Sequence, residues 1–239
     1  MTRPFAAIFP VFAIILALLP GRAMASEGSP YFIRELERGH WQKIVAYGTS
    51  LTAAAAWPVS LQTQLRGRFG WRATVVNAAG SGMDSRWGLA NLSQRVLKQK
   101  PDVVLIEFTI NDALAQSKLS VTESKANLTE MIQQIRAARP HCEVIVLIMN
   151  PPTGQALEKR SQIRHYESGY REVASKQSCR LIDFSPEWRR IVAHQPSRWR
   201  RYAADGLHPT AQACDEVILP KLLRKIGFTP GTASERKTS

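Results

Sequence analysis

The sequence is poor in acidic residues and in cysteine. Its 239 residues include 19 Asp and Glu against 32 Lys and Arg, so the formal net charge is +13. The three cysteines (Cys142, Cys179 and Cys214) form no Cys-x-x-Cys pair, and the five histidines are scattered, without a His-Glu-x-x-His motif. Closely spaced thiols or imidazoles mark zinc sites, so we expect neither a metal nor a cofactor.

Two further motifs are present only in part. The segment 80–85 (GSGMDS) follows a strand but lacks the third glycine of the dinucleotide fingerprint, and no acidic residue ends a later strand at the required distance. The segment 48–52 (GTSLT) ends in Thr52, where the G-x-S-x-G elbow of α/β-hydrolases has glycine. The sequence therefore disfavours both a nucleotide enzyme and the α/β-hydrolase fold.

Long apolar runs are absent except near the N-terminus. Arg3 precedes the run Phe5–Leu19, and Ala23-Met24-Ala25 has the small-x-small form of a cleavage site. These features predict a secretory signal peptide over residues 1–25. The alternative is a membrane anchor, but the run is short and contains Pro10. We expect a periplasmic or secreted protein with no stable membrane insertion after cleavage.

The positive charge would survive this cleavage. Residues 1–25 contain Arg3 and Arg22 and no acidic residue, so the net charge would fall from +13 to +11. In an exported protein such a charge indicates acidic polysaccharide, phospholipid head groups or no specific partner, rather than nucleic acid. We expect a monomer.

Apolar runs alternate with amphipathic segments along residues 26–228. The expected strands are Lys43–Tyr47, Ala73–Asn77, Val103–Phe108, Glu143–Met149 and Arg180–Phe184. The expected helices are Val59–Arg68, Trp87–Lys98, Thr122–Ala138, Gln155–Gln177 and Ala211–Ile226. Nearly continuous apolar strands separated by helices predict an α/β domain with a parallel sheet covered on both faces. Residues 229–239 are polar, and we expect them to be disordered.

Cys142 and Cys179 each open an expected strand, so they could be neighbours. Whether they form a disulfide in an oxidising compartment stays open at this point.

Polar residues gather where the expected strands end. Ligands of parallel α/β sheets bind at the carboxyl ends of the strands. Ser50 follows the first strand, Gly82 the second and Asn111 the third, while Asp205 and His208 precede the last helix. A carboxylate that orients an imidazole, which in turn activates a serine, is the arrangement of a serine hydrolase. The N–H groups of Ser50 and Gly82 and the Asn111 amide could hold an oxyanion.

Each of these residues also has a plainer interpretation. Ser50 could cap the helix that follows it. Asp205-Gly206 could be a simple turn, with His208 just before the start of the last helix. Asp112 is more readily a hydrogen-bond acceptor that fixes its loop than a second acid.

Four short segments together resemble the four sequence blocks of the SGNH, or GDSL, hydrolase superfamily. They are Gly48-Thr49-Ser50-Leu51, the loop with Gly80 and Gly82, Asn111-Asp112 and Asp205-x-x-His208. The resemblance spans about 43–226 and is greatest to the secreted esterases, thioesterases and lysophospholipases. It implies a three-layer α/β/α sandwich with a flavodoxin-like, five-stranded parallel sheet. It also implies the nucleophile Ser50, the base His208, its orienting partner Asp205, and an oxyanion hole of Ser50, Gly82 and Asn111.

The sequence departs from the family pattern twice. Thr49 stands where the family has Asp before the nucleophile, and Thr109 stands where it has Gly two residues before Asn111. We expect Thr49 to tune the turn rather than the reaction, and Thr109 to reshape the pocket floor. Gly80, the alternative oxyanion donor to Gly82, is expected to be a turn glycine.

Basic and aromatic residues near the expected site indicate the class of substrate. Arg86, Trp87 and Trp199 are the candidates for binding it, with a solvated basic surface as the alternative. No long apolar flap suits a fatty chain, which favours short acyl groups such as acetyl on a cell-surface or exported polysaccharide. The alternatives are a lysophospholipase or thioesterase acting on lipid substrates, a carbohydrate O-acyltransferase, and a non-catalytic polysaccharide-binding accessory protein.

Overall fold

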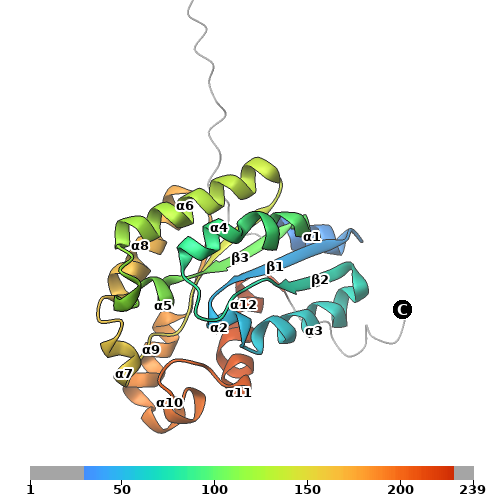
Figure 1. Ribbon diagram of the computed structural model, residues 1–239. Coiled ribbons are helices and arrows are strands. Elements are labelled where there is room, and N and C mark those ends of the chain that lie inside the picture. Colours follow the sequence, from blue (N-terminus) through green and yellow to red (C-terminus); the bar gives the residue numbers. More distant parts are fainter. Residues whose placement is uncertain (1–29, 229–239) are drawn as a thin grey trace, which may run out of the picture.

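A five-stranded, all-parallel sheet forms the centre of the molecule (Figure 1). The computed structural model describes residues 30–228, so the expected signal peptide (1–25) and the tail (229–239) lie outside the described residues. The strand order is β2-β1-β3-β4-β5. Their bounds are β1 Gln42–Gly48, β2 Ala73–Asn77, β3 Val103–Glu107, β4 Glu143–Ile148 and β5 Arg180–Asp183. The expected five strands and the doubly wound order of a flavodoxin-like sheet are confirmed.

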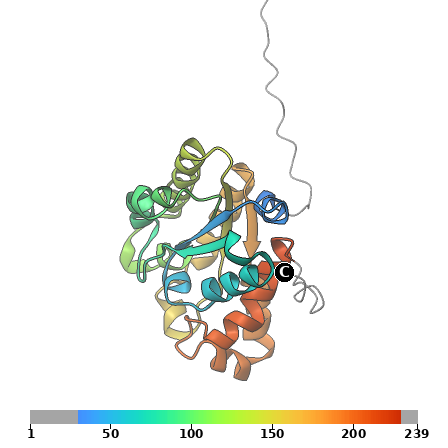
Figure 2. The ribbon, with the colours of Figure 1, turned by 90° about the vertical axis from the view of Figure 1, so that its right-hand side faces the viewer.

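Helices cover both faces of this sheet (Figure 2). One layer consists of α4 (Ser85–Arg95), α6 (Val121–Ala138) and α8 (Ile163–Lys176). On the other face lie α1 (Tyr31–Glu37), α3 (Trp57–Phe69), α9 (Ser185–His194), α10 (Pro196–Tyr202) and α12 (Leu219–Lys225). Short helical segments lie at the strand ends and in the loops: α2 (Ser50–Ala53), α5 (Thr109–Asp112), α7 (Gly154–Glu158) and α11 (Ala211–Ala213). The architecture is therefore a three-layer α/β/α sandwich.

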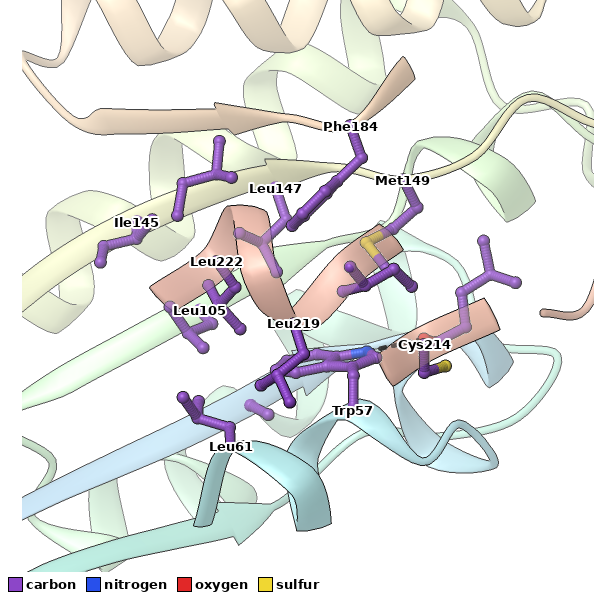
Figure 3. Close-up of a cluster of buried hydrophobic side chains, with 14 of the residues drawn as sticks. Trp57, Leu61, Leu105, Ile145, Leu147, Met149, Phe184, Cys214, Leu219 and Leu222 are labelled. Carbon is purple, nitrogen blue, oxygen red and sulfur yellow. Dashed lines mark hydrogen bonds between the residues drawn. The ribbon is translucent and has the colours of Figure 1, made fainter. Parts of the chain in front are cut away.

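The apolar strands explain this layering, because each strand buries side chains on both faces. All five residues of β3 are buried. Leu105 and Leu147 point from β3 and β4 toward one helical layer, where they meet Trp57, Leu219 and Leu222 from α3 and α12 (Figure 3). Alternate strand residues pack under α4, α6 and α8 in a second core. The two cores fix the sheet, and with it the place where the strands end.

The helices differ from expectation in several regions. The single helix expected over 155–177 is divided into α7 and α8, with Arg160 buried in the break. Helices α1, α9 and α10 were not predicted. The last helix is confirmed, but it passes through a π-helical stretch, Cys214–Ile218, between α11 and α12.

The three cysteines are present as thiols. Cys142 and Cys214 are buried and Cys179 is half-buried, and none of them is in a disulfide. Within residues 30–228, no helix has both the length and the apolar character needed to cross a bilayer.

Candidate active site

Three of the predicted site residues form a chain of hydrogen bonds at the carboxyl edge of the sheet. Ser50 begins α2, two residues after the end of β1, and its Oγ lies 2.8 Å from Nε2 of His208. Nδ1 of His208 lies 2.6 Å from Oδ2 of Asp205. A carboxylate at Nδ1 keeps the proton on that nitrogen, so Nε2 is free to accept the hydroxyl proton of Ser50.

This part of the site is open to solvent. The side chains of His208 and Asp205 are 45% and 54% exposed. Burial acts to raise the pKa of Asp205, but hydrogen bonds from the His208 ring and from the backbone N–H groups of His208 and Leu207 outweigh it and hold the pKa below its usual value. Asp205 therefore stays ionised next to the imidazole at neutral pH.

The loop after β4 holds the Asp205–His208 turn in place. Gly206 has a φ of +74°, and a Cβ there would lie 2.6 Å from the backbone oxygen of Thr153. The Thr153 N–H donates to the Gly206 carbonyl, and the Asn150 amide donates to the Leu207 carbonyl at 2.7 Å. The turn thus needs glycine both for its backbone angle and for this close contact.

The nucleophile turn rests on a buried glutamate. Glu107, the last residue of β3, accepts the backbone N–H of Thr49 at 2.7 Å and the Thr52 hydroxyl at 2.8 Å. The Thr49 hydroxyl lies 3.0 and 3.1 Å from its two oxygens. A Cβ at Gly48 would lie only 2.3 Å from Oε1 of Glu107, so this carboxyl requires glycine before the turn. The expectation that Thr49 shapes the turn agrees with these contacts.

Burial governs the charge of this glutamate. Glu107 has no exposed surface, and burial raises its pKa to about 8, against hydrogen bonds from Thr49 and Thr52 that lower it. Most molecules therefore carry a proton on Glu107 at pH 7. That proton can lie between Oε2 and the Thr49 hydroxyl, while Oε1 accepts the other two donors.

Two of the expected oxyanion donors, Gly82 and Asn111, lie in the segments that follow β2 and β3. Gly82 has a φ of +76° and is exposed. Gly80, by contrast, uses its N–H on the Gly48 carbonyl, and a Cβ there would lie 2.8 Å from both Met83 and Trp87. Gly80 is therefore a packed turn residue, and the geometry favours Gly82 as the donor.

Asn111 is held with one amide hydrogen engaged. Its Nδ2 donates to the Met83 carbonyl at 3.0 Å, which leaves the second hydrogen for a ligand. The neighbouring Asp112 accepts hydrogen bonds from Ser85 N–H, Ser124 and Tyr170. As expected, Asp112 is a buried acceptor that fixes its loop, and burial raises its pKa to about 6.

The residues expected to bind substrate differ in exposure. Arg86 is exposed, but it is tied to Asp84 at 2.6 Å and to the Ser117 carbonyl. Trp87 is half-buried and packs against Tyr47. Trp199 is only 6% exposed.

This burial leaves little of the Trp199 surface for contact with substrate, and its role in binding stays a prediction. Its indole N–H donates to Thr153 Oγ1 at 2.9 Å and its ring packs against Trp188. An aromatic residue of this size is buried when neighbouring helices cover it, and Trp199 here joins α10 to α9 and to the loop after β4.

Comparison with known proteins supports the family suggested by the motifs. A model of the "GDSL-like Lipase/Acylhydrolase family" matches residues 44–214. The chain belongs to this family.

Two curated relatives are esterases. An arylesterase of Vibrio mimicus is 30% identical over 178 residues, which cover 72% of this chain and 82% of the relative. Esterase TesA of Pseudomonas aeruginosa is 27% identical over 211 residues, 86% of this chain and 96% of the relative. This GDSL-like chain is therefore an enzyme, a carboxylic ester hydrolase.

The fold is also that of solved family structures. The acetylxylan esterase Axe2 of Geobacillus stearothermophilus superposes with a TM-score of 0.68, at 20% identity, over 82% of this chain and 98% of Axe2. At this identity the likeness bears on the fold alone. Among residues 30–228, no cluster of three or more His, Cys, Asp or Glu side chains could hold a metal ion.

Sequence reasoning on this GDSL-like chain missed two buried charged residues beside the site. Glu107 stands within the apolar run of β3, and a lone acid in such a run is a signal that could have been noticed. Arg160 carries no comparable signal, because the pattern over 155–177 reads as one helix. Its guanidinium, buried behind the Asn111 loop, becomes visible only in the structure.

Proposed function

We propose that this enzyme is exported and removes short acyl groups, acetyl above all, from a cell-surface or exported polysaccharide. The observation that carries the proposal is the hydrogen-bonded chain from Ser50 through His208 to Asp205. It lies beside β1 and β3, between which the strand order reverses, and ligands of such sheets bind at this point.

In the first half of the reaction, Ser50 Oγ attacks the ester carbonyl carbon while His208 Nε2 takes its proton. Negative charge develops on the carbonyl oxygen, where the N–H groups of Ser50 and Gly82 and the Asn111 amide stabilise it. His208 then gives the proton to the departing alcohol oxygen, and the acyl group remains on Ser50.

In the second half, His208 takes a proton from a water molecule, which attacks the acyl carbon. The same donors hold the second oxyanion. The Ser50 oxygen leaves, recovers the proton from His208, and the carboxylic acid departs. Ionised Asp205 stabilises the imidazolium in both halves.

The openness of the acid–base side supports a polymeric substrate. His208 and Asp205 are about half exposed, so a bulky alcohol could reach Nε2 without a closed pocket. The net charge of +11 that remains after the expected cleavage favours an acidic polymer. The similarity in fold to an acetylxylan esterase is compatible with this substrate class.

A fluorophosphonate probe tests the chemistry, because it reacts only with an activated serine. We expect one labelled site, Ser50, and loss of both labelling and turnover in Ser50→Ala. Turnover retained by Ser50→Ala would show that another residue is the nucleophile. Labelling at another serine would refute the assignment.

Rates on nitrophenyl esters of increasing chain length, followed by an acetylated polysaccharide, test the substrate. We expect the acetyl ester to be the faster substrate and acetate to be released from the polymer. A preference for chains of twelve carbons or more would contradict the proposal and favour a lipid substrate. Transfer of the acyl group to added sugars would indicate an acyltransferase.

Export is tested separately by fractionation and by the N-terminal sequence of the mature protein. We expect it to begin at Ser26, after cleavage behind Ala25. A chain that retains residues 1–25 in the membrane fraction would indicate an anchor.

A further inference from the structure

Arg160 carries a buried positive charge between α7 and α8. Its side chain donates from Nε to the Ile110 carbonyl at 2.7 Å, from Nη1 to the Ala156 carbonyl at 3.2 Å, and from Nη2 to Asn111 Oδ1 at 3.5 Å. The residue is 7% exposed. All three acceptors are neutral, and within residues 30–228 Arg160 belongs to no ion pair. Burying a charge without a counter-ion destabilises a fold, so this arrangement needs a functional reason.

The contacts of Arg160 determine which way the Asn111 amide faces. A guanidinium only donates hydrogen bonds. The atom of the Asn111 amide that faces it must therefore be the oxygen, because the amide nitrogen is also a donor. On the other side, the Met83 carbonyl accepts from Nδ2. The two neighbours together exclude the flipped amide. Through Nε, Arg160 also holds the carbonyl of Ile110, directly before Asn111.

We propose that Arg160 is a positioning residue for ester hydrolysis, which holds the Asn111 amide with its free N–H toward the oxyanion and strengthens that donor. This inference rests on the proposed function of the same site. A cation on the amide oxygen polarises the amide, so that its N–H becomes a better donor. The strengthened N–H meets a full negative charge only when the oxyanion forms. Such an interaction is stronger in the transition state, which is how it raises kcat.

The first experiment compares Arg160→Gln and Arg160→Lys with the wild type on a nitrophenyl ester. We expect Arg160→Gln to lower kcat by about 10- to 100-fold with KM changed by less than about 3-fold, since the lost interaction is made in the transition state. Arg160→Lys keeps the charge and should lose less. The matched control is Arg164→Gln, on the exposed surface of α8, which should leave both constants unchanged.

A double-mutant cycle with Asn111→Ala separates positioning from general structural support. If Arg160 acts through Asn111, adding Arg160→Gln to Asn111→Ala should lower kcat by less than about 3-fold further. Two effects that multiply in full would overturn the inference, and so would Arg160→Gln with unchanged kcat. Should Arg160→Gln not fold, Arg160→Lys takes its place in the cycle with the same criteria.

These outcomes leave the proposed function distinguishable. If the effects of Arg160→Gln and Asn111→Ala on kcat multiply while Ser50 is still labelled by fluorophosphonate, only the role of Arg160 is refuted. A wild type that neither turns over esters nor reacts with the probe refutes the proposed function, and with it the inference.

Discussion

The two halves of the candidate active site meet solvent in opposite ways. The acid–base half, Asp205 and His208, lies on an exposed turn, with side chains about half accessible. The half that carries the nucleophile and the oxyanion donors rests on Glu107, Asp112 and Arg160, which are all buried. Exposed groups can exchange protons with water and admit an alcohol, whereas buried polar groups fix positions at a cost in stability. Activity and stability should therefore respond to different substitutions.

The largest effect is expected on activity in the exposed half. His208→Ala removes the base for both steps, and we expect kcat to fall by at least about 10,000-fold. Because His208 is exposed, the urea midpoint should stay near that of the wild type. His165→Ala, at another exposed histidine, is the control and should retain full activity. A loss below about 100-fold in His208→Ala would show that another group acts as base.

The next effect is expected on stability in the buried half. Glu107→Ala leaves the Thr49 N–H and the Thr52 hydroxyl without their acceptor and opens a cavity. We expect the free energy of unfolding to fall by about 3–5 kcal/mol, measured by urea denaturation. The control is Glu158→Ala, an exposed glutamate, which should change it by less than about 0.5 kcal/mol. A loss as small as that of the control would mean that Glu107 does not support the turn.

The two halves of the site should also contribute to stability with opposite dependence on pH. Folding raises the pKa of Glu107 from its usual 4.5 to about 8, so the folded state holds this proton more tightly than the unfolded chain. The contribution of this proton to the free energy of unfolding is complete below about pH 4.5 and declines as the pH rises toward 8. Asp205 has a lowered pKa, so its contribution is present above the usual value and is lost as the pH falls.

Glu107→Gln tests this difference, because it keeps the shape and removes the titration. Measured by urea denaturation between pH 5 and 8, the variant should lose less stability with rising pH than the wild type. Asp112, whose pKa is raised to about 6, titrates in both proteins, so the comparison is between the two slopes and not between each slope and zero. Identical slopes would show that Glu107 does not titrate in this range.

The sequence predicts the exposed half and the scaffold better than the buried half. Nearly continuous apolar runs such as 103–108 predict strands. Because ligands of parallel sheets bind at the carboxyl ends of the strands, the sequence also predicts that Ser50, Asn111 and His208 lie at one edge. The role of Glu107 depends on Thr49, 58 positions earlier in the chain, a contact that no local pattern encodes. Arg160 depends on a break between α7 and α8, and the burial of Trp199 on packing against another helix, and both are tertiary effects.

The smallest effect on turnover is expected where the two halves join, at Thr49. Thr49→Asp restores the family residue and brings a second carboxyl within hydrogen-bond reach of Glu107. Below about pH 8, Glu107 carries a proton that the two carboxyls can share, so the turn should keep its shape. We expect kcat at pH 7 to change by less than about 100-fold, which corresponds to about 2.7 kcal/mol of barrier.

The added carboxylate raises the pKa of Glu107 further, so the pair loses its shared proton only at alkaline pH, and two negative charges then face each other under Ser50. The kcat of Thr49→Asp should then fall more steeply with pH than that of the wild type, whereas Thr49→Ser, which keeps the hydroxyl, should follow the wild type. A change beyond about 100-fold at pH 7 would show that Thr49 matters for the reaction itself. Parallel pH profiles for Thr49→Asp and Thr49→Ser would show that the charge of Glu107 does not reach the nucleophile.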